Sequence, residues 1–180
     1  YWAESYNCDM TRTQNFYDMQ SLAFLSVLMN GDAFAVLPMK KIGTSPYSLR
    51  VKLFEGDQCI SPNGDTSIDG TVLGGIKIDA DGAPVEYYFA KKHPGDLNSY
   101  SNIPGETITI PAFGAESGRR NVLHLMFKER IGQRRGAPIL APVLEQLKQS
   151  SRLTDSELMA SVINACFTVF ITSPGPELPF

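Results

Sequence analysis

The first periodic pattern along the chain is helical. Between residues 15 and 29, apolar side chains recur at almost every third or fourth position, which is typical of a helix with an apolar face. Thr11 or Thr13 is available to cap its start, and the glycine of Asn30-Gly31 can adopt the left-handed conformation at its end. The pattern predicts a helix over residues 15–29.

Strand patterns follow this helix. Residues 32–39 have the nearly continuous apolar pattern of a buried strand, and residues 49–54 alternate as a half-buried strand does. In the second strand, Arg50 and Lys52 fall on the polar face. The polar link over residues 40–48 contains Gly43 and Pro46, so we expect the two strands to be antiparallel neighbours.

The clearest hairpin signal lies further along the chain. Residues 74–79 and 85–90 read as strands, and Asp79-Ala80-Asp81-Gly82 between them has the composition of a tight turn. Two shorter strands are predicted over residues 107–110 and 122–127.

The last third of the chain changes to helical periodicity. A helix is predicted over residues 138–150, and a Thr154-x-x-Glu157 capping box predicts the start of another that runs to about Phe170. This last helix is apolar on most of its circumference and therefore needs partners on several sides. The fold class is α+β, with an N-terminal helix, antiparallel strands and a hairpin, then two C-terminal helices. We divide it into a mixed α/β part, residues 1–135, and a helical part, residues 136–180.

Composition excludes several classes of protein. The 180 residues are 43% hydrophobic and 19% charged, which argues against intrinsic disorder. No apolar run reaches the roughly 18 residues that span a bilayer, so we expect no membrane contact. Three cysteines lie far apart in the sequence, without a Cys-x-x-Cys pair, and this favours reduced thiols. A single disulfide between two of them is the alternative.

Charge is unevenly distributed along the chain. The formal net charge is −3, yet residues 119–152 contain eight basic side chains and only two acidic ones. The stretch is interpreted as a solvated basic face, a contact for nucleic acid, or a contact for an acidic face of a neighbouring protein. The candidate DNA- or partner-facing residues are Lys128, Arg130, Arg134, Arg135, Lys148 and Arg152.

No spacing of residues specifies an active site. His93 and His124 are the only histidines, and no metal-binding or phosphate-binding motif is present, so no cofactor is predicted. His124 alternates with leucines in a predicted strand, where a histidine is more often a hydrogen-bonded structural residue than a catalytic one. The alternative is a hydrolase that uses His124 together with a carboxylate.

Four sequence segments in the second half of the chain carry a family resemblance. They are Val-x-His at 122–124, Gln-x-Arg-Gly-x-Pro at 133–138, Leu-Ala-Pro-Val-x-x-x-Leu-Lys at 140–148, and Phe-Thr-Val-Phe-Ile at 167–171. In this order they resemble the portal proteins of lambda-type tailed bacteriophages. The resemblance extends weakly to the upstream strands and covers a central portion of a portal subunit.

The resemblance implies a structural role and no enzyme activity. Portal proteins form a ring, a dodecamer when full length, at one capsid vertex, where DNA passes non-specifically through the channel and terminase and head-tail joining proteins dock. The chain would then belong to the virion, after assembly in the host cytoplasm, and would contain parts of the wing, clip and stem. Side chains expected to pack between subunits are Leu158, Val162, Phe167 and Phe170. A β-rich binding module of a phage head or tail is the remaining alternative.

Overall fold

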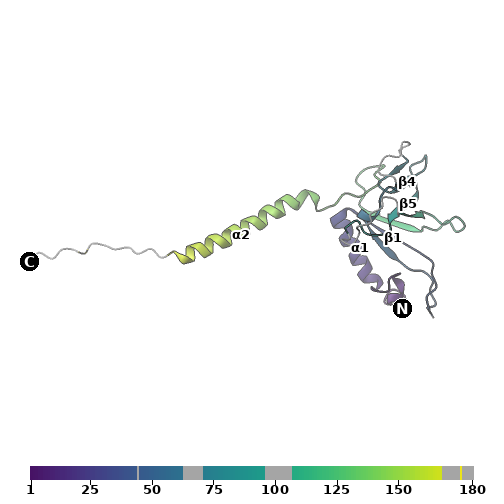
Figure 1. The fold of residues 1–180 in the computed structure, drawn as a ribbon, viewed down its shortest axis with the longest axis horizontal. Helices are drawn as coiled ribbons and strands as arrows, with labels where there is room; N and C mark the ends of the chain where they lie inside the picture. The colour runs from purple at the N-terminus through teal and green to yellow at the C-terminus, as the bar shows by residue number, and fades with distance from the viewer. Residues whose placement is uncertain (44, 63–70, 96–106, 168–174, 176–180) are drawn as a thin grey trace, which may run out of the picture. The chain divides into compact units, whose positions relative to one another are not determined.

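The computed structural model describes residues 1–43, 45–62, 71–95, 107–167 and 175. It is a mixed helix and sheet fold that divides into two compact units, Tyr1–Ala141 and Pro142–Phe180. The first unit contains one long helix and two antiparallel sheets, and the second contains the helix α2 (Leu144–Cys166; Figure 1).

Helix α1 (Phe16–Asn30) confirms the predicted N-terminal helix, with a different cap. The side chain of Asn15 accepts a hydrogen bond from the backbone N–H of Asp18 at 2.9 Å, so the prediction of a threonine cap was wrong. Thr11 and Thr13 instead bind the carboxylate of Asp9 through their hydroxyls. The helix ends at Gly31, which adopts the left-handed conformation with φ of 92°.

The strand β1 (Asp32–Val36) lies at the centre of a three-stranded sheet. Its neighbours are β2 (Lys52–Glu55) and β7 (Val122–Met126), both antiparallel to it. β1 is shorter than predicted and ends at Val36. Beyond that point, Met39 forms only an isolated bridge with Leu49. The predicted exposure of Arg50 was also wrong, since its side chain is fully buried and donates hydrogen bonds to two backbone carbonyl groups.

A second, four-stranded sheet has the order β3-β4-β5-β6. The turn of the predicted hairpin is confirmed: Asp79 Oδ1 accepts hydrogen bonds from the N–H groups of Asp81 and Ala83, and Gly82 has a positive φ of 84°. Its first strand is shorter than predicted, because Gly74 and Gly75 form the turn before Ile76. The last two predicted strands belong to different sheets, since β6 is in this one and β7 in the other. The bounds are β3 Val72–Leu73, β4 Ile76–Ile78, β5 Pro84–Ala90 and β6 Thr107–Pro111. Short 3-10 turns are η1 Tyr6–Cys8, η2 Gly56–Gln58 and η3 Ala141–Val143.

The three-stranded sheet lies between α1 and the four-stranded sheet. On one face of β1, Ala33 packs against Ala23 and Val27 of α1. On its other face, Phe34 is fully buried against Phe89 of β5, with ring centroids 5.3 Å apart. Because alternate side chains of a strand point to opposite faces, β1 is buried along its whole length.

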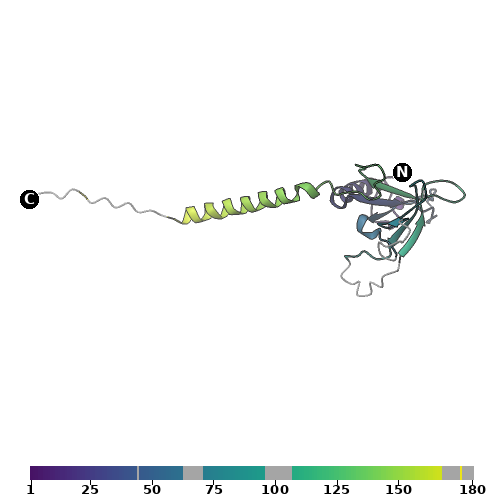
Figure 2. The ribbon, with the colours of Figure 1, turned by 90° about the horizontal axis from the view of Figure 1, so that it is seen from above.

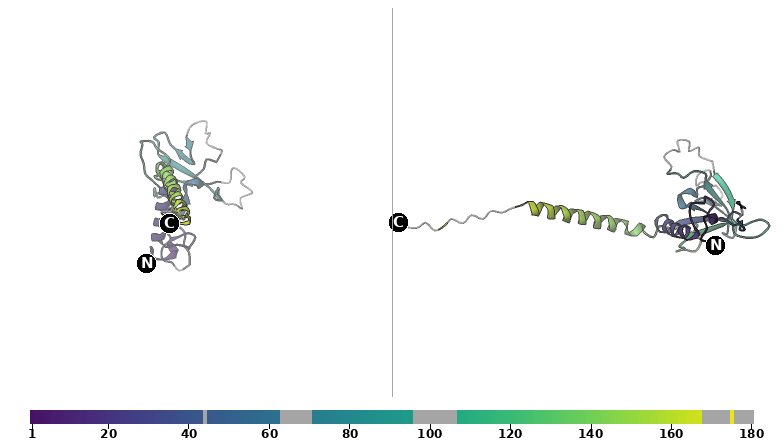
Figure 3. Two further views of the ribbon diagram at one scale, coloured as in Figure 1. Left: turned by 90° about the vertical axis from the view of Figure 1, so that its left-hand side faces the viewer. Right: turned by 90° about the horizontal axis from the view of Figure 1, so that it is seen from below.

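Helix α2 (Leu144–Cys166) replaces the two predicted C-terminal helices, so that prediction was wrong. It runs without interruption in Figure 2 and in the right-hand view of Figure 3. No proline or glycine occurs between its ends, so nothing stops it at the expected boundary. Thr154, the expected cap, is inside the helix and donates its hydroxyl hydrogen to the carbonyl of Ser150 at 3.0 Å.

Candidate functional site

Arg135 binds inside its own chain, although it belongs to the basic stretch. Its guanidinium forms a two-point ion pair with Asp32, with Nε to Oδ2 at 2.6 Å and Nη2 to Oδ1 at 3.1 Å. It also donates hydrogen bonds to the carbonyls of Gly56, Cys59 and Gly74. One side chain therefore joins β1, the η2 turn and the β3–β4 turn.

Asp32 is the buried counterpart of this arginine, with 1% of its side chain exposed. It also receives hydrogen bonds from the N–H of Gly136 at 3.2 Å and interacts with Nε2 of His124 at 3.3 Å. Burial alone would raise the pKa of Asp32, but the His124 and Arg135 hydrogen bonds and the Arg135 charge outweigh it and lower this pKa to about 2. The carboxylate is therefore ionised at neutral pH.

His124 belongs to this cluster through a hydrogen bond to Asp32 and a ring contact. Its ring stacks on Phe34 with centroids 4.3 Å apart, and 12% of its side chain is exposed. Its carboxylate partner, Asp32, is also held by Arg135. Within the described parts of the chain, no three His, Cys, Asp or Glu side chains are grouped so as to hold a metal ion. The three cysteines are free thiols.

Residues 128–133, which we call the basic turn, follow β7. Oε1 of Gln133 accepts hydrogen bonds from the N–H groups of Glu129 and Arg130, at 2.8 and 3.2 Å, and Nε2 donates to the carbonyl of Arg135 at 2.8 Å. Lys128 and Arg130 are exposed, and Arg134, just after the turn, is partly buried. The chain therefore presents two cations on a turn that a single glutamine closes.

Two glycines bring the chain back to the end of α1. A Cβ atom on Gly31 would lie 2.6 Å from the carbonyl oxygen of Gly136, and one on Gly136 would overlap the backbone of Gly31. Further on, the N–H of Leu140 donates to the carbonyl of Leu28 at 3.4 Å. Only glycine allows this close passage of two backbone segments.

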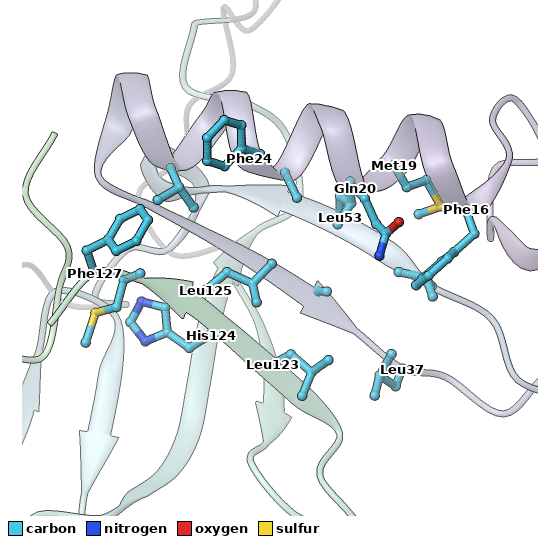
Figure 4. Close-up of a pocket in the computed structure, with 15 residues that line it drawn as sticks. Phe16, Met19, Gln20, Phe24, Leu37, Leu53, Leu123, His124, Leu125 and Phe127 are labelled. Carbon is cyan, nitrogen blue, oxygen red and sulfur yellow. The ribbon is translucent and has the colours of Figure 1, made fainter. Parts of the chain in front are cut away.

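Helix α1 exposes an apolar surface that the sequence reasoning missed. An open groove of about 530 Å³ lies between α1 and the three-stranded sheet (Figure 4). Phe24 and Phe127 lie toward one end of it and Phe16 toward the other, while Gln20 points into it. The helix has one charged residue, Asp18, in fifteen, which was the signal available in the sequence. Its exposed large apolar side chains are Tyr17, Leu22, Phe24, Leu25 and Met29.

A second pocket flanks α1 on the side of β2. It has a volume of about 310 Å³ and is lined by apolar side chains of α1, by Leu53, and by the acidic residues Glu55 and Asp57. Both acidic residues are exposed. The pocket is therefore apolar at its base and has two carboxylates at its rim, of which Glu55 also contacts Nε2 of His93 at 3.2 Å.

The remaining predicted site residues belong to the second unit, where each described one is exposed. Lys148 and Arg152 are four residues apart on α2 and so lie on the same side of it. Leu158 and Val162 are also spaced by four, with 65% and 54% exposure, and Phe167 follows the helix at 74%. Phe170 lies outside the described residues.

Comparison with known proteins decides the family. A family model described as "Phage portal protein, lambda family" matches residues 1–180. The chain belongs to the lambda family of phage portal proteins. It is 23% identical to portal protein B of Escherichia phage lambda over 167 residues and 26% identical to the portal protein of Escherichia phage N15 over 169 residues. Each alignment covers 92% of this chain and 30% of the relative.

The portal-family resemblance identified from sequence is thus confirmed, and its Gln-x-Arg-Gly-x-Pro segment has a structural explanation. Gln133 closes the basic turn, Arg135 binds Asp32, and Gly136 passes against Gly31. The segment holds the basic turn on the first unit of this portal-family chain.

In the part of the chain that the structure describes, no helix is long and apolar enough to cross a membrane.

Proposed function

We propose that this chain is part of a structural subunit of a phage portal ring at the capsid vertex, where the ring forms the channel for DNA packaging and ejection. The match of the family model over residues 1–180 carries the proposal. A role without catalysis agrees with the Asp32 carboxylate, which is bound by both His124 and Arg135 inside the fold. The protein would be a virion component that assembles in the host cytoplasm.

The proposed contacts with DNA, terminase and head-tail joining proteins use the exposed cations. Lys128 and Arg130 are held on the basic turn, and Lys148 and Arg152 lie on one side of α2. A channel must let every DNA sequence slide, so contact with phosphates rather than bases is the suitable chemistry, and it weakens with salt. Arg135 is not assigned such a contact, because its charge is matched by Asp32.

Contacts between subunits account for the exposed apolar side chains of α2. Leu158 and Val162 share one side of the helix, and Phe167 follows it. A helix in water seldom keeps such large apolar side chains exposed when its protein is fully assembled. We assign this side of α2 to packing within the full-length, ring-forming protein.

Removal of the gene from the phage that encodes it tests this function. Without the protein, capsids should contain no DNA, and expression of the intact protein from a plasmid should restore packaged DNA. Capsids that fill with DNA in its absence would contradict the proposal.

A further inference from the structure

We infer that neighbouring copies of this chain are joined by Ile131 of one copy, which enters the acidic-rimmed pocket between α1 and β2 of the next. The inference rests on the proposed ring, and it names a specific contact within it. Four observations support it. Ile131 is exposed, the pocket has an apolar lining, the net charges around Ile131 and around the pocket are opposite, and the two surfaces lie at opposite edges of the three-stranded sheet.

The tip is Ile131, at the most exposed point of the basic turn. Its side chain is fully exposed, at 107% of the reference value, so it occupies no pocket of its own copy. Gly132 follows it with φ of 80°, and Gln133 holds the N–H groups of Glu129 and Arg130 across the base of the turn. A turn that is already ordered loses little conformational entropy when it binds, which favours its use as a docking element.

The pocket offers the surface that such a tip requires. Leu22, Leu25 and Met29 of α1 and Leu53 of β2 form its apolar lining, and Leu25 and Met29 are 50% and 59% exposed. An isoleucine side chain placed there would remove apolar surface of both copies from water.

The net charges around the tip and the pocket are opposite in sign. The basic turn exposes two cations, Lys128 and Arg130, and one carboxylate, Glu129, whereas Glu55 and Asp57 line the pocket. When the tip enters the pocket, its cations come close to these carboxylates. Complementary potentials of this kind orient partners and disfavour the pairing of two tips or two pockets.

Strand order separates the two surfaces within one copy. β7, which leads into the basic turn, and β2, which lines the pocket, are the opposite edges of the sheet β2-β1-β7. Met126 pairs with Asp32 and Glu55 pairs with Ala33, so the turn leaves β7 at the same end of the sheet at which β2 ends. A contact between two different surfaces is heterologous, and its repetition generates a closed ring when the rotation between copies fits.

Cysteine cross-linking in the full-length protein tests the contact. We would prepare Ile131→Cys, Leu25→Cys and the double variant, with the parent protein as the control for its own thiols, of which Cys166 is exposed. Under mild oxidation, each single variant alone should match the parent, a mixture of the two single variants should give covalent dimers, and the double variant should give a ladder of multimers. An Ile131→Cys variant that cross-links with itself, or a mixture that gives no dimer, would overturn the inference.

Charge reversal provides a second measurement that does not depend on the thiols. Arg130→Glu and Asp57→Lys should each raise the concentration for half-maximal assembly by about tenfold at low salt, and the double variant should recover most of the loss. Lys41→Glu, at an exposed position away from both surfaces in sequence, is the matched control. Two single variants that assemble like the parent would refute the charge pairing.

The outcomes also separate this contact from the proposed function. If the parent forms rings and the variants form them equally well, with no cross-link in the mixture, the contact is wrong and the portal role stands. If the parent itself forms no ring, the proposed function fails.

Discussion

The ion pair between Asp32 and Arg135 allows a quantitative prediction. Replacement of Asp32 by Asn keeps the size of the side chain and removes its charge, so the guanidinium of Arg135 loses the anion that it contacts at 2.6 Å. The arginine keeps its hydrogen bonds to the carbonyls of Gly56, Cys59 and Gly74. The substitution therefore tests the charge pair separately from the shape of the site.

The expected loss follows from the environment of the carboxylate. The pKa of Asp32 is lowered from 3.8 to about 2, and such a shift corresponds to about 2 kcal/mol of folding free energy at neutral pH. Removing one partner of a buried ion pair costs about 3–5 kcal/mol, because the other charge stays buried. Because Arg135 keeps its hydrogen bonds to three carbonyl groups, we expect a value at the lower end of this range. Asp32→Asn should therefore destabilise the first unit by about 3 kcal/mol.

The pH dependence of this loss has a definite sign. Because the folded-state pKa is lowered, the contribution of Asp32 to stability is fully present above the ordinary pKa of 3.8 and is lost as the pH falls toward about 2. The difference in stability between the parent and Asp32→Asn should therefore be largest near neutral pH. It should shrink progressively below about pH 5.

Amide hydrogen exchange in the full-length protein, followed by mass spectrometry, measures this difference locally. A loss of about 3 kcal/mol should speed exchange in peptides from β1 and β7 by about a hundredfold at neutral pH. Asp81→Asn, the same chemical change at an exposed turn position, should leave these peptides unaffected. Unchanged exchange of β1 and β7 in Asp32→Asn would refute the conclusion that this buried ion pair stabilises the three-stranded sheet of the first unit.

Three further predictions concern other features of the first unit and the thiols. Gly31→Ala should lower the melting temperature clearly more than Gly118→Ala, because both glycines have positive φ but only Gly31 lies against another backbone segment; equal losses would contradict the close passage. Gln133→Leu should speed exchange at the amides of Glu129 and Arg130 about tenfold without affecting β5, and protection equal to the parent would mean that Gln133 does not close the turn. Cys166 should react with iodoacetamide in the folded protein, whereas Cys59, buried and with a pKa raised to about 12 by burial, should react only after unfolding; labelling of Cys59 under native conditions would contradict its burial.

Local features of the fold could be predicted from the sequence, because their causes lie within a few residues. Gly31 ends α1 and Asp79-Ala80-Asp81-Gly82 forms the hairpin turn, both by short-range backbone chemistry. The Thr154 cap failed for a local reason as well. A threonine hydroxyl can bond to the carbonyl four residues earlier in a helix that is already running, so the capping pattern alone does not mark a start.

The inward position of Arg135 could not be predicted, because its partner lies 103 residues away in sequence. A run of basic residues looks uniform in sequence, and nothing in it distinguishes the arginine that meets Asp32 from the exposed Arg130. Arg50 is similar: its alternating pattern indicates a polar face, but its side chain is buried and donates hydrogen bonds to the carbonyls of Lys40 and Asn7. Long-range partners of buried charges require the three-dimensional structure.

Electron microscopy of the purified full-length protein tests the central claim most directly. The portal account predicts closed rings of cyclic symmetry with a central channel, in which the sheet β2-β1-β7 of each copy lies beside that of the next. Particles that remain single subunits, or that form two-fold dimers without a channel, would contradict it.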